Sequence, residues 1–264
     1  MLKHVKIDLG DRMKTKIYLA NEEFTSGMTL KESTSFENNN MALHVAKDET
    51  MVIKNREKLA KYLGVELHNF VCADQTHSAN FHKVTRADQG RGANSIETAI
   101  PNTDALYTDE AGIVLCCFTA DCVPVMFHNN VSGIIGVIHS GWQGTVKQIT
   151  LNVFRHLLDV EKCNPNDFYV QIGAALSQEK FEVDDDVYEK FHALGYANEF
   201  IYYKDETNKY HIDNQQTVKK QCELAGIPSE HISIDKTCTF LSSEGFSYRE
   251  DKQTGRHLSF IMKK

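Results

Sequence analysis

Three side chains that can bind a metal ion lie at or near apolar stretches of the chain. Cys122 lies in the peptide 120–124 (ADCVP), and His139 opens the peptide 139–144 (HSGWQG). His77 lies upstream, in a polar segment. Two imidazoles and one thiol are a ligand set typical of an open zinc site, whose fourth position is left for water or substrate. The combination favours an enzyme.

The stretches around these residues predict the elements that hold them. The apolar runs 112–118, 123–127 and 133–138 are bounded by turn residues and predict three buried strands, with a turn at Asn129-Asn130. Cys122 and His139 then stand at strand ends, where functional side chains are usually held. A cysteine in such a place is more often an inert apolar residue, and a lone histidine often bonds only to a neighbouring carbonyl. Their shared position favours the functional interpretation.

Periodicity and turn signals predict the other elements. We expect strands at 17–20, 168–172 and 257–262, a surface loop at 25–41, and helices over 48–64, over 146–158, from the acidic run 184–186, and from Asp213 to Gly226. Strands occur both as hairpins and between helices, which favours mixed sheets covered by helices. The sequence therefore predicts an α/β (α+β-like) fold, with residues 1–264 in a single domain.

Composition excludes several classes of protein. The chain has 264 residues and a net charge of −7, so it lacks the basic surface of a nucleic-acid binder. No apolar run approaches the roughly 18 residues of a membrane span, and residues 1–8 alternate in polarity, unlike a signal peptide. Seven cysteines, an odd number, do not indicate a disulfide framework. We expect a cytoplasmic enzyme, either a monomer or a homodimer.

Several segments together resemble the laccase-domain purine nucleoside phosphorylases, a family formerly described as multicopper polyphenol oxidases. The resemblance runs from about Leu43 to the C-terminus and rests on residues 75–77 (QTH), 120–124, 139–144, 172–175 (IGAA), 181–183 (FEV), 238–240 (CTF) and 246–249 (FSYR). It implies mixed sheets flanked by helices and one zinc ion held by His77, Cys122 and His139. It also implies that Arg56, in the pair Asn55-Arg56, binds phosphate; the plain alternative is an exposed helical arginine.

The resemblance implies two reactions. One is phosphorolysis of adenosine, inosine and methylthioadenosine to the free base and ribose 1-phosphate. The other is hydrolytic deamination of adenosine, in which a water polarised by zinc attacks C6 of the purine. Asp121 is a candidate for orienting a ligand, with capping of the following turn as its structural alternative. The sequence does not reveal which group protonates the leaving purine.

The chain departs from the family pattern at three positions. Residues 24–31 lack the arginine of the usual Thr-Arg-x-Gly-Gly stretch, Gln143 replaces an arginine after the tryptophan, and Glu250 replaces the second arginine of Ser-Tyr-Arg-Arg. These changes remove cations, so we expect weaker binding of phosphate or substrate. The metal ligands themselves are intact.

Other functions use the same residues. A copper polyphenol oxidase is the historical interpretation, but the His-x-His pairs of multicopper sites are absent from the sequence. A metal-free hydrolase would use Cys122 as nucleophile and His139 as base. A non-catalytic metal-binding protein needs a fourth ligand, for which His82 and His128 are candidates. Affinity alone favours copper over zinc, so metal availability decides which ion is bound.

Overall fold

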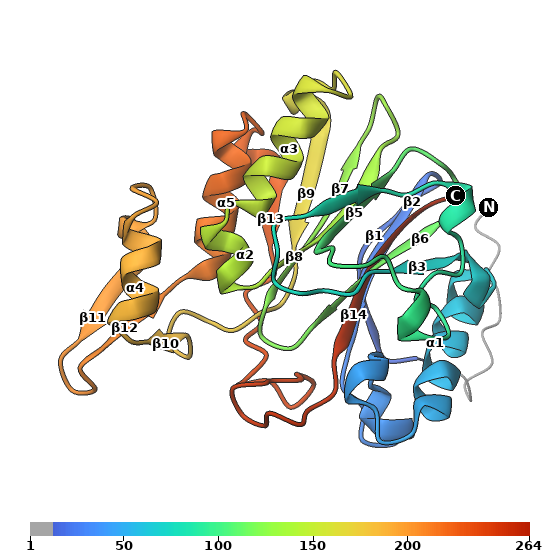
Figure 1. Cartoon of the computed structure of the whole chain (residues 1–264), viewed down its shortest axis with the longest axis horizontal. Helices are drawn as coiled ribbons and strands as arrows, with labels where there is room; N and C mark the ends of the chain where they lie inside the picture. The colour runs from blue at the N-terminus through green and yellow to red at the C-terminus, as the bar shows by residue number, and fades with distance from the viewer. Residues whose placement is uncertain (1–12) are drawn as a thin grey trace, which may run out of the picture.

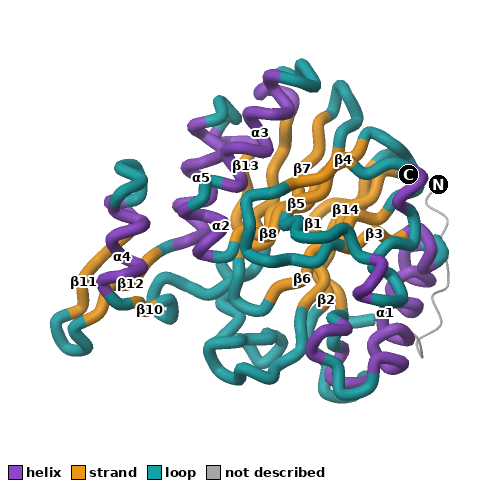
Figure 2. Tube along the Cα trace, viewed as in Figure 1, coloured by secondary structure: helices purple, strands orange, loops and turns teal. Residues whose placement is uncertain are grey.

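The structure is a computed structural model that describes residues 13–264. Within this range the strands form three sheets, two large and one small (Figures 1 and 2). The five-stranded sheet has the order β1 (Thr15–Ala20), β2 (Phe24–Thr29), β14 (His257–Lys263), β6 (Val114–Thr119) and β3 (Phe70–Cys72). The six-stranded sheet has the order β13 (Ile232–Ile234), β9 (Phe168–Ile172), β7 (Val123–Asn129), β8 (Ile135–Ser140), β5 (Ala105–Thr108) and β4 (Phe81–Lys83).

The two large sheets pack face to face, and helices cover their outer faces (Figure 1). Helix α1 (Glu49–Leu63) lies on the five-stranded sheet, whereas α2 (Trp142–Val146), α3 (Ile149–Asp159) and α5 (Asn214–Leu224) lie beside the six-stranded sheet. Alternate residues of β6 face opposite layers: Cys116 packs toward α1, and Leu115 packs between the sheets. A strand buried on both faces must be apolar throughout, which explains the continuous run in the sequence.

The small third sheet projects from the body of the molecule (Figure 1). It has the order β10 (Glu182–Val183), β12 (Lys209–Ile212) and β11 (Ile201–Lys204), and α4 (Asp185–His192) packs on it. Its apolar cluster includes Phe181 and Phe191 and reaches Trp142 at the start of α2. This extension therefore lies against the segment that follows His139.

Most of the expected elements are confirmed. The three central strands are β6, β7 and β8, and α1 begins after its N-cap Asp48 and ends at Gly64, which has a φ of 73°. Helix α5 begins after Asp213, whose side chain accepts a hydrogen bond from the backbone N–H of Gln216. The mixed α/β class is confirmed. No helix described between residues 13 and 264 is long and apolar enough to cross a bilayer.

One expectation was wrong, and one was right only in part. The surface loop predicted over 25–41 contains β2, a strand whose six residues are all buried between β1 and β14. The strand was not predicted because its sequence is polar and contains a glycine. Glycine is required at position 27, since a Cβ there would lie 2.7 Å from the backbone oxygen of Lys16. The helix predicted over 146–158 is confirmed from Ile149 onward as α3, but Val146 belongs to α2. The two helices are separate because Gln148 adopts a left-handed φ of 61° that a right-handed helix cannot include. The expectation for residues 1–8 lies outside the described residues.

Candidate metal centre and cavity

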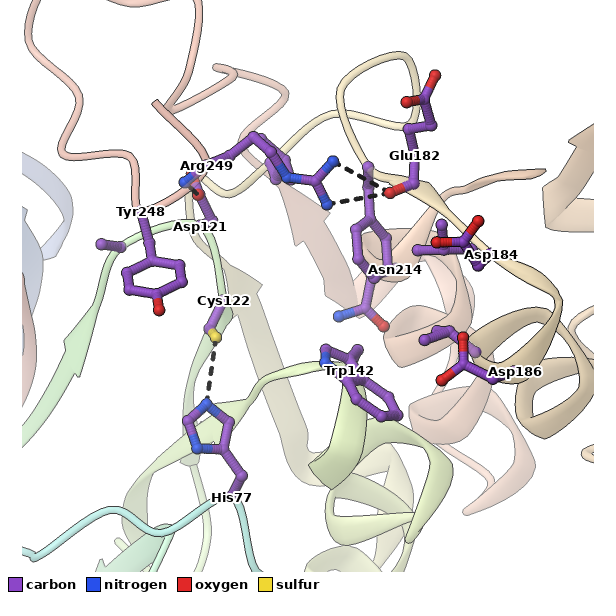
Figure 3. A pocket seen from close by; sticks show the side chains of 15 residues that line it. His77, Asp121, Cys122, Trp142, Glu182, Asp184, Asp186, Asn214, Tyr248 and Arg249 are labelled. Atoms are coloured by element: carbon purple, nitrogen blue, oxygen red, sulfur yellow. Dashed lines mark hydrogen bonds between the residues drawn. The ribbon is translucent and has the colours of Figure 1, made fainter. Parts of the chain in front are cut away.

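His77, Cys122 and His139 come together as predicted. One ligating atom from each of the three side chains lies within 4.8 Å of the others. Cys122 Sγ is 3.8 Å from His77 Nε2, and the two imidazole rings meet edge to face with their centroids 4.8 Å apart. Figure 3 shows the thiol and the His77 ring pointing toward each other. Two imidazoles and a thiolate suit Zn²⁺, and the soft thiolate also suits copper.

Each of the three residues is held by a different segment. His139 is the second-last residue of strand β8, and Cys122 is in the short connection between β6 and β7. His77 lies between β3 and β4 and has a left-handed φ of 58°. Non-glycine residues seldom adopt this conformation, and such strained positions concentrate at functional sites.

Gly141 makes the close approach of these segments feasible. A Cβ atom at this position would lie 2.8 Å from Cδ2 of His77 and 2.9 Å from Sγ of Cys122. Real Cβ atoms essentially never approach other atoms this closely. The glycine in the HSGWQG peptide is therefore required by the space that the three side chains occupy.

Asp104, which the sequence did not single out, organises the centre. Its buried carboxylate lies 2.8 Å from Nδ1 of His139, so the imidazole donates Nδ1–H to it and directs Nε2 toward Cys122. The same carboxylate accepts hydrogen bonds from the backbone N–H of His77 and from the N–H and hydroxyl of Ser78. One carboxylate thus fixes both histidines. The available signal was an aspartate directly before the apolar strand β5, which is too common to be diagnostic.

The charges of the centre reinforce one another. Burial alone would raise the pKa of the Cys122 thiol, but the charge of His139 and hydrogen bonds from both histidines outweigh burial and lower it. Burial would lower the pKa of His139, but the Cys122 thiolate and Asp104 raise it. Burial would also raise the pKa of Asp104, yet its hydrogen bonds from His139 and Ser78 lower it to about 2. The cysteine is therefore held as a thiolate, the form that binds metal.

Asp121, the other predicted catalytic residue, anchors residues 238–249, here called the C-terminal segment. Its φ is 82°, and its carboxylate accepts hydrogen bonds from the hydroxyls of Thr239 and Ser247 and from the backbone N–H of Arg249. These bonds tie residues 238–249 to the turn that carries Cys122. The role in orienting a metal ligand that was predicted for Asp121 stays a prediction.

Arg56 is not brought to the three-residue centre. It is 2% exposed, so the alternative of an exposed helical arginine is wrong. Its Nε donates to the carbonyl of Met41, and its Nη1 donates to those of Gly92 and Ala93. It lines a second cavity of about 200 Å³, together with His44 and Asp74. These contacts favour a structural role, and phosphate binding by Arg56 stays a prediction.

The two histidines considered as a fourth ligand lie elsewhere. His82 Nε2 is 3.3 Å from Asp88, and His128 stacks against Tyr169. Among residues 13–264, the cluster of metal-capable side chains at the centre has three members. Three protein ligands leave a coordination position for water or substrate, which is typical of catalytic rather than structural zinc sites.

A cavity of about 410 Å³, here called the main cavity, opens beside the centre (Figure 3). His77 and Cys122 line it, the small third sheet and α4 form another part of its wall, and the C-terminal segment contributes Tyr248 and Arg249. Its apolar and aromatic lining consists of Ala120, Trp142, Leu176, Phe181, Val183, Val187 and Tyr248. The sequence motifs contained Trp142, Tyr248 and Arg249 but gave no reason to place them in one cavity.

Comparison with known proteins identifies the family. The sequence profile of the family described as multi-copper polyphenol oxidoreductase laccase matches residues 25–264. The chain belongs to this family. It is 37% identical over 243 residues to the protein of Geobacillus stearothermophilus named purine nucleoside phosphorylase YlmD, with 89% of each chain covered. The Bacillus subtilis protein of the same name is 36% identical over 247 residues, covering 91% of this chain and 89% of the relative.

Solved structures of family members have the same fold. The crystal structure of YlmD from G. stearothermophilus superposes with a TM-score of 0.86 at 35% identity, covering 91% of this chain and 92% of that one. The hypothetical protein YfiH of Bacillus licheniformis gives a TM-score of 0.87, also at 35% identity, with 91% and 93% covered. The resemblance to laccase-domain purine nucleoside phosphorylases is therefore confirmed.

Proposed function

We propose that this chain is a metal-dependent purine nucleoside phosphorylase that converts adenosine, inosine or methylthioadenosine and phosphate to the free base and ribose 1-phosphate. We propose further that it deaminates adenosine. The observation that carries the proposal is the open His77–Cys122–His139 centre on the wall of the main cavity. The names of the relatives, purine nucleoside phosphorylase, point to the same reaction.

The lining of the main cavity suits an uncharged nucleoside. Trp142 and Phe181 supply aromatic surface for a purine ring, and a volume of about 410 Å³ is in the range of small-molecule sites. Glu182, Asp184 and Asp186 also line the cavity.

In phosphorolysis, a phosphate oxygen attacks C1′ of the sugar while the C1′–N9 bond breaks. The bonding electrons pass to N9 of the purine, which takes up a proton. A metal ion held by His77, Cys122 and His139 would polarise an oxygen of phosphate or water and stabilise negative charge. Asp104 keeps His139 in the tautomer that leaves Nε2 free to bind the ion.

In deamination, water adds to C6 of adenosine and ammonia leaves, giving inosine. The reaction needs C6 of the base at the metal centre, whereas phosphorolysis needs the phosphate and C1′ to meet. The two reactions therefore require different placements of the nucleoside. A cavity of about 410 Å³ leaves room for both.

A product assay on purified protein of measured metal content tests the proposal. Adenosine and inosine are incubated with and without phosphate, and products are identified by liquid chromatography and mass spectrometry. We expect free base and ribose 1-phosphate only with phosphate, and inosine from adenosine without it. Cys122→Ser is expected to abolish both, whereas Cys163→Ser, at a partly buried free thiol outside the main cavity, serves as the matched control. Metal-loaded wild-type protein that turns over neither nucleoside would refute the proposal.

The geometry also favours a second candidate. A Cys122 thiolate beside His139, which is in turn bonded to Asp104, is the arrangement of a cysteine hydrolase. Removal of metal separates the two: a cysteine hydrolase keeps its activity after chelation, and the proposed phosphorylase loses it.

A further inference from the structure

The main cavity has one permanent cation in its wall. Of the residues that line it within the described part of the chain, Arg249 is the one lysine or arginine. Four carboxylate residues, Asp121, Glu182, Asp184 and Asp186, also line it. Arg56 lines the second cavity instead, and Glu250, the neighbour of Arg249, is anionic. An anionic substrate that enters the main cavity can therefore pair with a single guanidinium, that of Arg249.

The guanidinium of Arg249 is held at one edge and free at another. Both terminal nitrogens, Nη1 and Nη2, donate to the backbone oxygen of Glu182 at 3.0 Å, as Figure 3 shows. Arginine has five N–H donors, and these two bonds use the edge between the terminal nitrogens. Among residues 13–264, the N–H of Nε and the second N–H of each terminal nitrogen have no hydrogen-bond acceptor. The edge formed by Nε and one Nη is thus available for two oxygens of a planar or tetrahedral anion.

The backbone of Arg249 is tied to the metal centre. Its N–H donates to the carboxylate of Asp121 at 2.7 Å, and Asp121 precedes Cys122 in the chain. The side chain then crosses to Glu182 at the start of β10. Arg249 therefore bridges the two walls of the cavity, and its orientation is fixed at both ends. Such preorganisation reduces the entropy lost when a ligand binds.

We propose that Arg249 is the phosphate-binding residue of the main cavity, with inorganic phosphate bound by the free Nε–Nη edge. This inference rests on the proposed phosphorylase and names the subsite of its anionic substrate. The bond between Arg249 and the carbonyl of Glu182 is kept when phosphate binds, because it uses the other edge of the guanidinium. The bound phosphate supplies the oxygen that forms the bond to C1′, and the purine leaves with the electrons of the C1′–N9 bond.

The test compares Arg249→Gln and Arg249→Lys with wild-type protein, all loaded with metal. Arg86→Gln is the matched control, because Arg86 has a side chain that is 77% exposed and does not line the main cavity. The KM for phosphate is measured at saturating inosine, and the KM for inosine at saturating phosphate. Binding of inorganic phosphate without nucleoside is measured in parallel by isothermal titration calorimetry, with adenosine 5′-monophosphate as the second probe.

We expect Arg249→Gln to raise both the KM and the Kd for phosphate on the order of tenfold to a hundredfold, the value of charge-assisted hydrogen bonds. The KM for inosine should stay within about twofold, since a ground-state contact to phosphate alone is lost. Arg249→Lys keeps the charge but not the two-pronged geometry and should fall between the wild-type protein and Arg249→Gln.

Three results would overturn the assignment. The first is an unchanged Kd for phosphate in Arg249→Gln, and the second is a KM for inosine that rises in parallel with the KM for phosphate. The third is weaker binding of adenosine 5′-monophosphate, but not of inorganic phosphate, in Arg249→Gln. The second result would indicate that Arg249 only holds the cavity wall together. If the wild-type protein turns over no nucleoside, the proposed function fails. The phosphate titration still decides the subsite, because it needs no turnover.

Discussion

Asp104→Asn is the substitution that most directly tests how the metal centre is built. The Oδ2 atom of Asp104 accepts from the hydroxyl of Ser78 and from the backbone N–H groups of Ser78 and Thr76. Its Oδ1 atom accepts from the N–H of His77 and faces Nδ1 of His139. An asparagine keeps the shape but replaces one of these acceptors by an NH₂ group.

The structure determines which side the NH₂ group takes. Three donors meet Oδ2, so the asparagine oxygen should take that position and the NH₂ group should face His77 N–H and His139 Nδ1. His139 must then accept at Nδ1, and its proton moves to Nε2, the atom that would bind the metal. The N–H of His77 loses its acceptor in a partly buried place. We expect a loss of about 2 to 4 kcal/mol in unfolding free energy from these broken hydrogen bonds, and roughly 10- to 100-fold weaker metal binding.

Two measurements separate these effects. Metal affinity is obtained by competition with a chromogenic chelator, and the unfolding free energy by urea denaturation in the presence of a strong chelator. Asp88→Asn is the matched control, because Asp88 is also buried, accepts a backbone N–H from Thr85 and faces His82 at 3.3 Å. The control should lose stability but keep the metal affinity of the wild-type protein. Unchanged metal affinity in Asp104→Asn, with the mutant folded, would refute the view that Asp104 sets the tautomer of His139.

Three other predictions follow from buried groups. Burial holds the pKa of His257 at about 4, and its Nε2 accepts the N–H of Phe246, so protonation favours the unfolded chain. Lowering the pH from 7.5 to 5 should therefore reduce the unfolding free energy by about 2 kcal/mol through this one group. Urea titrations of His257→Gln at the two pH values should lack this loss. Arg56→Met should lower the unfolding free energy by about 3 to 5 kcal/mol, because three buried carbonyls lose their donor. Normal stability together with a raised KM for phosphate would instead support phosphate binding by Arg56, the role predicted from the sequence. Gly141→Ala should weaken metal binding in the chelator assay, because its Cβ would press on Sγ of Cys122, and unaltered affinity would show that the turn can shift.

Local signals in the sequence determined much of the secondary structure and the three metal-capable side chains. Apolar runs bounded by turns located β6, β7 and β8, and an N-cap aspartate with a terminal glycine located α1. These signals act between residues close in sequence, so they can be recognised without the fold. Strand β2 was not predicted from the sequence, because it is buried by its neighbours β1 and β14 rather than through apolar side chains of its own.

Only the tertiary structure decided how those side chains are supported. Asp104 reaches His139 across 35 positions, and Asp121 reaches Arg249 across 128. Hydrogen bonds of this kind have no periodicity, since their spacing depends on which strands become neighbours. The same holds for Arg56, whose helix signal was correct but whose guanidinium is enclosed by carbonyls of two distant loops. The sequence therefore determined which groups can do chemistry, and the packing of the two sheets decided which of them meet.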